Sequence, residues 1–98
     1  MFLFDAEKKN IKIKEFSEKY YAVIEKQGNY FQGKIPGFDS AFVKMEVSFE
    51  SCVLSLEKML KRRIESYLKD GMPLPTPQEK QALMQQYVSA QIVALKIK

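Results

Sequence analysis

The sequence predicts an α+β domain: a three-stranded antiparallel meander, a long amphipathic helix, a short second helix, and a final strand that joins the same sheet. Two patterns lead to this prediction. Alternating, β-branched stretches separated by short turns fill the first half of the chain, and a long run with helical periodicity follows them. A chain of 98 residues with 46% hydrophobic residues has the size and composition of one globular domain. We therefore expect one sheet, with helices on one face, in the order β-β-β-α-α-β.

The stretch from Ser48 to Gly71 predicts the long helix on which the rest of the chain packs. Its apolar residues recur three and four positions apart, which places them on one buried face. They are Phe49, Cys52, Val53, Leu56, Met59, Leu60, Ile64, Tyr67 and Leu68. Ser48 is a good N-cap, and Gly71 followed by Pro73 ends the helix.

Three strands are expected before this helix. Lys19–Glu25 (KYYAVIE) is rich in aromatic and β-branched residues, and a turn with glycine and asparagine leads back into Tyr30–Ile35. Pro36 and Gly37 break this second strand. The third strand, Ala41–Val47, alternates between two faces. One face carries Ala41, Val43, Met45 and Val47, and the other carries Phe42, Lys44 and Glu46.

The two ends of the chain carry weaker patterns. Residues 1–18 predict an N-terminal arm, with or without a short strand at Asn10–Lys14, ahead of a single domain over residues 19–98. A capping box that begins at Thr76 predicts a short helix over Pro77–Gln86. Val88–Ile97 predicts the final strand, covered on both faces, and a parallel placement of it would require a right-handed crossover.

The composition argues against catalysis. The chain has no histidine, which is the residue most used for acid–base catalysis near neutral pH and the commonest metal ligand. The serines therefore lack a partner for a hydrolase triad, and the scattered glycines form no phosphate-binding loop. We expect a protein that is not an enzyme and needs no cofactor or metal. The single cysteine, Cys52, lies on the apolar helix face, which favours a core thiol over a reactive one.

The charge and the cysteine content limit the binding partners and the cellular compartment that we expect. A net charge of +4 permits weak attraction to nucleic acid or to acidic partners. One cysteine excludes an internal disulfide, and the N-terminus lacks the basic-then-apolar pattern of a secretory signal. No apolar run approaches the roughly 20 residues of a membrane span. We expect a cytoplasmic protein with no membrane contact.

The densest basic run lies on the predicted long helix. Lys58, Lys61 and Arg62 share one side of it by their three-four spacing. With the strand aromatics, of which we single out Tyr21 and Phe31, they predict residues that bind nucleic acid or a partner protein.

A second interpretation of these residues remains open. Lys61 stands four residues from both Glu57 and Glu65, so the basic run also fits a solvated face with local ion pairs. The aromatic residues of the strands equally fit cross-strand packing. They are Tyr20, Tyr21, Tyr30, Phe31 and Phe42.

Four segments follow one another in the order and spacing of the HicB family. They are YYAVIEKQGNYFQGK at residues 20–34, IPGF at 35–38, SFE at 48–50 and LKDGMPLPTP at 68–77. Over roughly residues 19–77 the chain resembles a HicB-like antitoxin domain. It departs from the family pattern at Phe38, where a cysteine usually follows Pro-Gly, and at Ser51, where a second acidic residue usually follows Glu50.

The resemblance implies a partial ribonuclease-H-like fold without catalytic carboxylates. It also implies a bacterial antitoxin that binds and neutralises a small mRNA-cleaving toxin of the HicA type, and we expect it to act as a homodimer. We expect a diverged member without the C-terminal DNA-binding module that many members carry. The alternative function is a small RNA-binding domain that uses the basic helix face and the strand aromatics.

Overall fold

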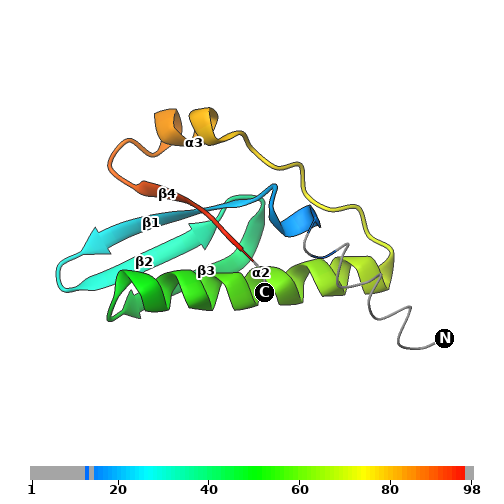
Figure 1. Ribbon diagram of the computed structural model, residues 1–98, viewed down its shortest axis with the longest axis horizontal. Helices are drawn as coiled ribbons and strands as arrows, with labels where there is room; N and C mark the ends of the chain where they lie inside the picture. The colour runs from blue at the N-terminus through cyan, green and yellow to red at the C-terminus, as the bar shows by residue number, and fades with distance from the viewer. Residues whose placement is uncertain (1–12, 14, 97–98) are drawn as a thin grey trace.

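The computed structural model describes Ile13 and residues 15–96 and contains the strands and helices in the predicted order (Figure 1). Its four-stranded sheet has the order β3-β2-β1-β4, and each neighbouring pair is antiparallel. The strands are β1 (Tyr21–Gln27), β2 (Tyr30–Ile35), β3 (Phe38–Glu46) and β4 (Gln91–Ala94). The helices are α2 (Phe49–Asp70) and α3 (Lys80–Gln86). The α+β prediction is confirmed.

The bounds of α2 follow from its two caps. The Ser48 hydroxyl accepts a hydrogen bond from the Ser51 N–H at 3.1 Å, and the Ser51 hydroxyl accepts one from the Ser48 N–H at 3.3 Å. These reciprocal bonds satisfy two backbone donors that would otherwise be free at the helix start. At the other end Gly71 adopts a φ of +66°, and its N–H bonds back to the Leu68 carbonyl. Both predicted caps are confirmed.

The apolar face of α2 packs on one face of the sheet, which we call the first face; the opposite face is the second face. Cys52, Leu56, Leu60 and Ile64 are fully buried there, as the periodicity predicts. Helix and sheet approach closely at Gly33 on β2. A Cβ atom added to Gly33 would lie 2.7 Å from Leu56 Cδ1 and 3.0 Å from Cys52 Sγ. The absence of a side chain at this position therefore sets the distance between α2 and the sheet.

Both ends of two strands, β1 and β3, differ from the prediction. β2 matches it, but β1 begins at Tyr21 and extends to Gln27, so that only two residues form the first turn. β3 begins at Phe38 rather than at Ala41. Gly37 has a φ of +99°, which lets a two-residue turn bring Phe38 directly opposite Ile35. The strand therefore starts as soon as this turn ends.

A bulge overturns the predicted faces of the last part of β3. Phe42 pairs with Lys34 and Val43 with Gly33, but Glu46 pairs with Phe31, so the third strand carries an extra residue between these pairs. Met45 has a φ of +61° there and is 68% exposed. An extra residue reverses the alternation beyond it.

The reversal is visible on both sides of the strand. Met45 and Val47 were predicted on the same face as Ala41 and Val43. This is wrong, because Ala41 and Val43 are buried whereas Met45 and Val47 are exposed. Glu46 was predicted on the opposite face. Instead its carboxylate accepts a hydrogen bond from the Ser55 hydroxyl of α2 at 3.1 Å.

The second helix is shorter than predicted. It begins at Lys80 rather than at Pro77, and Thr76 does not cap it: the N-cap residue is Glu79, which makes no side-chain capping bond. The preceding residues 72–79 form neither a helix nor a strand and follow an open path along the molecule (Figure 1). Alternating prolines favour such a path, and the Tyr20 hydroxyl fixes it by donating to the Pro75 carbonyl. This tertiary contact prevails over the local capping pattern.

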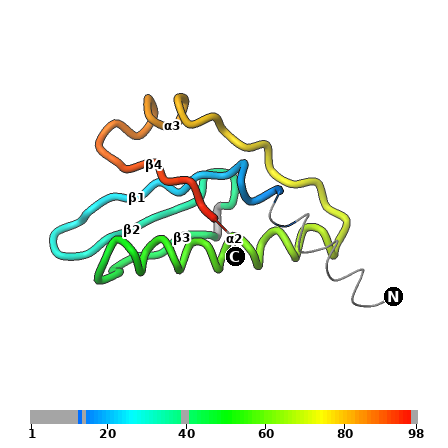
Figure 2. Tube along the Cα trace, in the orientation of Figure 1, coloured from blue at the N-terminus to red at the C-terminus, as the bar shows by residue number. Residues whose placement is uncertain are grey.

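The final strand is also shorter than predicted. β4 covers four residues rather than Val88–Ile97, and it runs antiparallel to β1, so the parallel crossover does not occur. Ile92 and Val93 are half-buried rather than fully covered. After β4 the chain returns to α2, where the Lys96 N–H donates to the Glu57 carboxylate at 2.8 Å (Figure 2).

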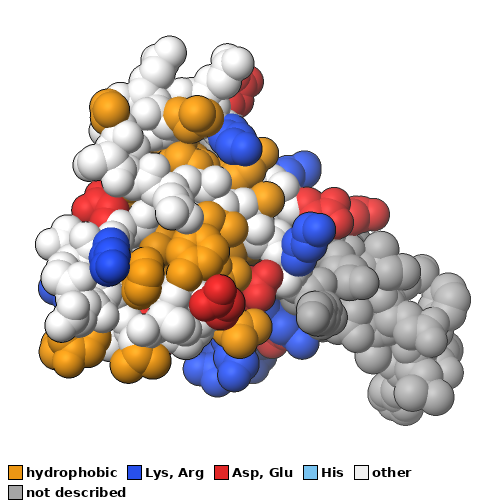
Figure 3. Space-filling view, turned by 60° about the vertical axis from the view of Figure 1, so that its left-hand side comes forward, with side chains coloured by type: hydrophobic (Ala, Val, Ile, Leu, Met, Phe, Trp, Pro, Cys, Tyr) orange, Lys and Arg blue, Asp and Glu red, His pale blue; other side chains and the backbone are white. Residues whose placement is uncertain are grey.

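The two helices do not share one face of the sheet, contrary to the expectation. Val23 and Lys34 are cross-strand partners, and strand alternation turns them away from the face on which Gly33 meets α2. The Lys34 ammonium lies 4.5 Å from the centre of the Tyr87 ring, directly after α3. Hydrophobic side chains also gather beneath α3 in the space-filling view (Figure 3). The turn after α3 therefore lies over the second face of the sheet.

The N-terminal part contributes to the core. Ile13 and residues 15–17 are helical, and the Ile13 side chain is buried in the cluster beneath α2. A strand at Asn10–Lys14 is thus wrong for Ile13. The other residues of that stretch lie outside the described part of the chain.

Candidate functional site

The basic run of α2 lies on its outer side, away from the sheet. Lys58 and Arg62 are exposed and Lys61 is partly exposed. Local pairing of Lys61 with Glu57 and Glu65 was the second interpretation of this run, and the Glu57 carboxylate also accepts a hydrogen bond from the Lys96 N–H. The three cations stand on one helical surface, with Leu54 exposed at the same spacing one turn earlier.

The two predicted aromatic site residues are not beside this surface. Phe31 lies on the α2 side of the sheet, where its ring packs edge-on against Phe49 with ring centres 6.3 Å apart. Tyr21 precedes Ala22, which is buried under α2, so strand alternation turns Tyr21 toward the second face. The structure therefore brings together the three helix cations and separates them from both aromatics.

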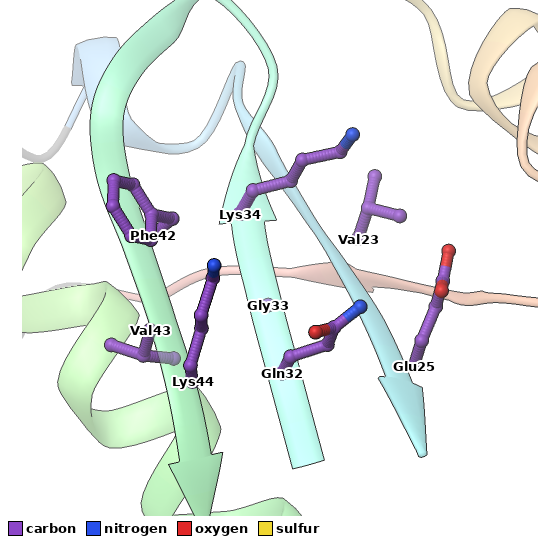
Figure 4. Close-up of a pocket in the computed structure, with 8 residues that line it drawn as sticks. All are labelled: Val23, Glu25, Gln32, Gly33, Lys34, Phe42, Val43 and Lys44. Carbon is purple, nitrogen blue, oxygen red and sulfur yellow. The ribbon is translucent and has the colours of Figure 1, made fainter. Parts of the chain in front are cut away.

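A hollow on the second face of the sheet contains a group of residues that the sequence did not single out together. Its volume is about 410 Å³, and Figure 4 shows the side chains around it. It is lined by Val23, Glu25, Gln32, Gly33, Lys34, Phe42, Val43 and Lys44. These residues come from β1, β2 and β3, so three adjacent strands form the hollow.

The register of the strands determines which side chains lie next to one another in this hollow. Val23, Lys34 and Phe42 form one row across the sheet, and Glu25 and Gln32 are direct partners in the next row. Phe42 and Lys44 rise from one side of the hollow and Glu25 from the other (Figure 4). Because Gly33 and Val43 pair with each other and face α2, they offer mainly backbone to the hollow.

The cations and the aromatic ring of the hollow are close together. The Lys44 ammonium lies 5.8 Å from the centre of the Phe42 ring, and Phe42 is 51% exposed. Lys34 lies at the other end, above the Tyr87 ring. The arrangement can accept a flat apolar group beside Phe42 and an anion near the two ammonium groups.

A second hollow lies between the β2–β3 turn and the end of α2. Its volume is about 380 Å³, and it is lined by Gly37, Phe38, Arg63, Ser66, Tyr67, Asp70 and Met72. The Nε atom of Arg63 is buried there and has no hydrogen-bond partner among the described residues. Because water does not reach this atom, a ligand in the hollow would meet the outer part of the guanidinium group rather than Nε.

Cys52 is a core thiol, as predicted. Its side chain is fully buried beside Leu56 and Gly33. Burial raises the pKa of the Cys52 thiol, and the nearby Glu46 carboxylate raises it further. Both effects favour the neutral thiol, which is a poor nucleophile and a poor metal ligand.

The described residues offer no metal site of the usual kind. Within Ile13 and residues 15–96, no group of three histidine, cysteine, aspartate or glutamate side chains could hold a metal ion. No helix in the same part of the chain is long and apolar enough to cross a membrane. On the face shown in Figure 3, basic and acidic side chains are interspersed rather than separated into fields of one sign.

A solved structure has a similar arrangement of strands and helices. One chain of a structure described as "HicA3 and HicB3 toxin-antitoxin complex" matches this chain with a TM-score of 0.56 and 21% sequence identity, over 81% of this chain and 96% of that chain. The two chains share a fold. No protein-family model matches the sequence, and no curated protein matches it.

The hollow on the second face is formed by β1, β2 and β3. The sequence contained a signal for it. Phe42 was among the strand aromatics, and the alternation of Ala41–Val47 placed Phe42 and Lys44 on the same face. The missing information was the register, which sets Lys34 and Gln32 beside them.

Proposed function

We propose that this chain is a HicB-like antitoxin that binds and neutralises a HicA-type mRNA-cleaving toxin and has no catalytic role of its own. The observation that supports this most is the common fold with a chain from a toxin–antitoxin complex. The sequence resemblance over roughly residues 19–77 points in the same direction. The absence of histidine from the sequence and the buried, neutral Cys52 are consistent with a function based on binding.

The outer side of α2 is the surface that we propose for the toxin. Lys58, Lys61 and Arg62 lie there, and Leu54 adds an apolar contact at 55% exposure. Interfaces often combine an apolar anchor with surrounding charges that select the partner. A basic surface on a chain of net charge +4 favours an acidic patch on the toxin.

The proposal also covers the cellular location and the oligomeric state of the protein. It places the protein in the bacterial cytoplasm as a homodimer with a partial ribonuclease-H-like fold, as the family resemblance implies. Light scattering of the purified chain tests the dimer, since the mass of one chain is 11.4 kDa. A mass near twice this value is expected, and a monomer across the micromolar range would contradict the dimer.

Co-expression tests the antitoxin function. The small open reading frame next to the gene is expressed as the toxin, and growth is measured with and without this chain. We expect growth arrest by the toxin alone and recovery when the chain is present. Persistent arrest despite equal expression of both proteins would refute neutralisation.

Charge reversal tests the proposed surface. The double variant Lys58→Glu/Arg62→Glu should lose the rescue, because it opposes an acidic patch with like charge. Lys26→Glu/Lys80→Glu is the matched control: it changes the net charge equally, at exposed positions on the first hairpin and on α3. If both variants lose the rescue equally, the effect is due to net charge, and the surface assignment fails.

A further inference from the structure

We propose that the hollow on the second face of the sheet binds one nucleotide of a single-stranded nucleic acid, with the base stacked on Phe42 and its two flanking phosphates held by Lys34 and Lys44. This inference goes beyond toxin binding and does not depend on it. The hollow and the outer side of α2 lie on different sides of the molecule, because α2 covers the first face of the sheet.

The first argument is the position of the Phe42 ring. The ring stands on an edge strand, beside a hollow, and half of its surface is exposed. The turn after α3 reaches Lys34 but leaves Phe42 open. An exposed aromatic ring on an antiparallel sheet offers a flat surface on which a base can stack, whatever its identity.

The second argument is the placement of two ammonium groups around this ring. The Lys44 ammonium lies over the ring, 5.8 Å from its centre, and Lys34 is on the neighbouring strand in the same row as Phe42. A base stacked on the other face of the Phe42 ring would therefore have two cations near it, within reach of its own phosphate groups. Such phosphate contacts supply most of the affinity in non-specific nucleic-acid binding.

The third argument concerns the far side of the hollow. Glu25 and Gln32 are direct cross-strand partners on this face. A carboxylate accepts hydrogen bonds from the exocyclic amino group of a base, and an amide both donates and accepts. The volume of about 410 Å³ falls in the range of small-ligand pockets, which begins at about 300 Å³.

These features together favour a nucleotide over an acidic peptide. A peptide carboxylate would use the lysines, but it would leave the Phe42 face unused and would meet the Glu25 carboxylate across the hollow. A nucleotide matches all three groups: the ring, the cations and the hydrogen-bonding pair. RNA, DNA and free nucleotides share this chemistry, so the experiment compares them.

The chain contains no tryptophan, which allows a direct test. Phe42→Trp places a single fluorescent ring in the hollow at a position that is 51% exposed, where the larger ring fits without disturbing the core. The probes are an adenosine RNA hexamer, the matching DNA hexamer and adenosine monophosphate, at 50 mM salt. We expect saturable quenching of the introduced tryptophan by at least one hexamer.

Two further measurements define the site. With two phosphate contacts and a slope of about −0.7 per contact for single strands, the affinity should fall about sevenfold between 50 and 200 mM salt. Adding Lys34→Gln/Lys44→Gln to the Phe42→Trp protein should weaken binding about tenfold and flatten this salt dependence. Lys58→Gln/Arg62→Gln, on α2, should leave both unchanged.

Leu54→Trp is the matched reporter on the outer side of α2, and its fluorescence should not be quenched. A second measurement uses a labelled hexamer and needs no tryptophan in the protein. Fluorescence anisotropy of the hexamer should show that Phe42→Leu binds about tenfold more weakly than the native protein.

Three results would overturn the proposal. They are absence of quenching in the Phe42→Trp protein, quenching in the Leu54→Trp protein alone, and quenching of the Phe42→Trp protein by a glutamate decapeptide to the same extent as by the hexamers. Toxin capture by the same variants separates a failure of this site from a failure of the antitoxin function.

Discussion

At the scale of single residues, Gly33 allows α2 to pack closely on the sheet. It lies at the centre of the sheet and permits the contact of β2 with Leu56 and Cys52. A methyl group at this position would overlap with both side chains, because the Leu56 Cδ1 distance of 2.7 Å is shorter than a normal carbon contact. The position of α2 on the sheet thus depends on the lack of a side chain at Gly33.

Gly33→Ala should therefore destabilise the fold by roughly 1–3 kcal/mol, the usual cost of overpacking a core. Urea unfolding followed by circular dichroism measures this difference. Gly28→Asn is the control: its φ is +62°, nothing lies within 4 Å of the added Cβ, and asparagine tolerates this conformation. Equal stability of Gly33→Ala and the native protein would show that α2 does not pack this closely.

Cys52 provides a second test at the same scale. Burial and the Glu46 carboxylate both raise the pKa of its thiol, so the folded state holds the neutral form. Because the folded pKa is the higher one, the stabilisation is complete below the ordinary thiol value and decreases as pH rises above about 8.5. Since the chain has one cysteine, reaction with a disulfide reagent should be slow in buffer and complete in denaturant. Rapid labelling of the folded protein would contradict the core placement of Cys52.

At the scale of elements, α2 is determined by its own sequence. The helical period, the Ser48 cap and the Gly71 end are local signals, and the observed helix follows all three. The reciprocal bond between Ser48 and Ser51 was not foreseen, because the usual acidic residue of a capping box is replaced by a serine.

Removal of this cap gives the prediction for α2. Ser48→Ala should reduce the free energy of unfolding by about 1 kcal/mol, because it leaves a backbone donor of the first turn without its partner. Ser66→Ala, at an exposed position within the same helix, should cause no loss. Thermal unfolding of the two variants compares them directly, and an equal effect would show that the capping bond contributes nothing measurable.

The shorter elements show where local sequence is insufficient. The alternation of residues 41–47 predicted β3 as a strand, but it could not locate the bulge at Met45, because a bulge depends on the pairing with β2. Likewise, the capping pattern at Thr76 was locally sound. The helix nevertheless begins at Lys80, and Tyr20, which is distant in sequence, binds the Pro75 carbonyl just before the predicted cap. Tertiary contacts decide both cases.

At the scale of the whole molecule, the sequence predicted the fold class and the order of elements but not the relation between the two faces. α2 covers one face of the sheet, and the turn after α3 lies over part of the other. The predicted site residues are divided by this arrangement. Lys58, Lys61 and Arg62 lie on the outer side of α2, and Phe31 packs beneath its start.

This arrangement gives the molecule two separate candidate surfaces. The outer side of α2 carries the cations and Leu54 that we propose for the toxin, and the opposite side of the sheet carries the hollow beside Phe42. Because the sheet separates the two surfaces, substitutions on one surface should not change binding at the other. An antitoxin with both surfaces could hold a toxin and a nucleic acid at the same time.

Direct binding of the toxin is the sharpest test of the antitoxin function. The purified chain is titrated by calorimetry into the product of the neighbouring small open reading frame, inactivated by substitution of its catalytic residue so that it can be expressed. We predict saturable binding of defined stoichiometry, which Lys58→Glu/Arg62→Glu weakens at least tenfold and Lys26→Glu/Lys80→Glu leaves unchanged. Absence of binding at micromolar concentrations of two folded proteins would contradict the antitoxin function.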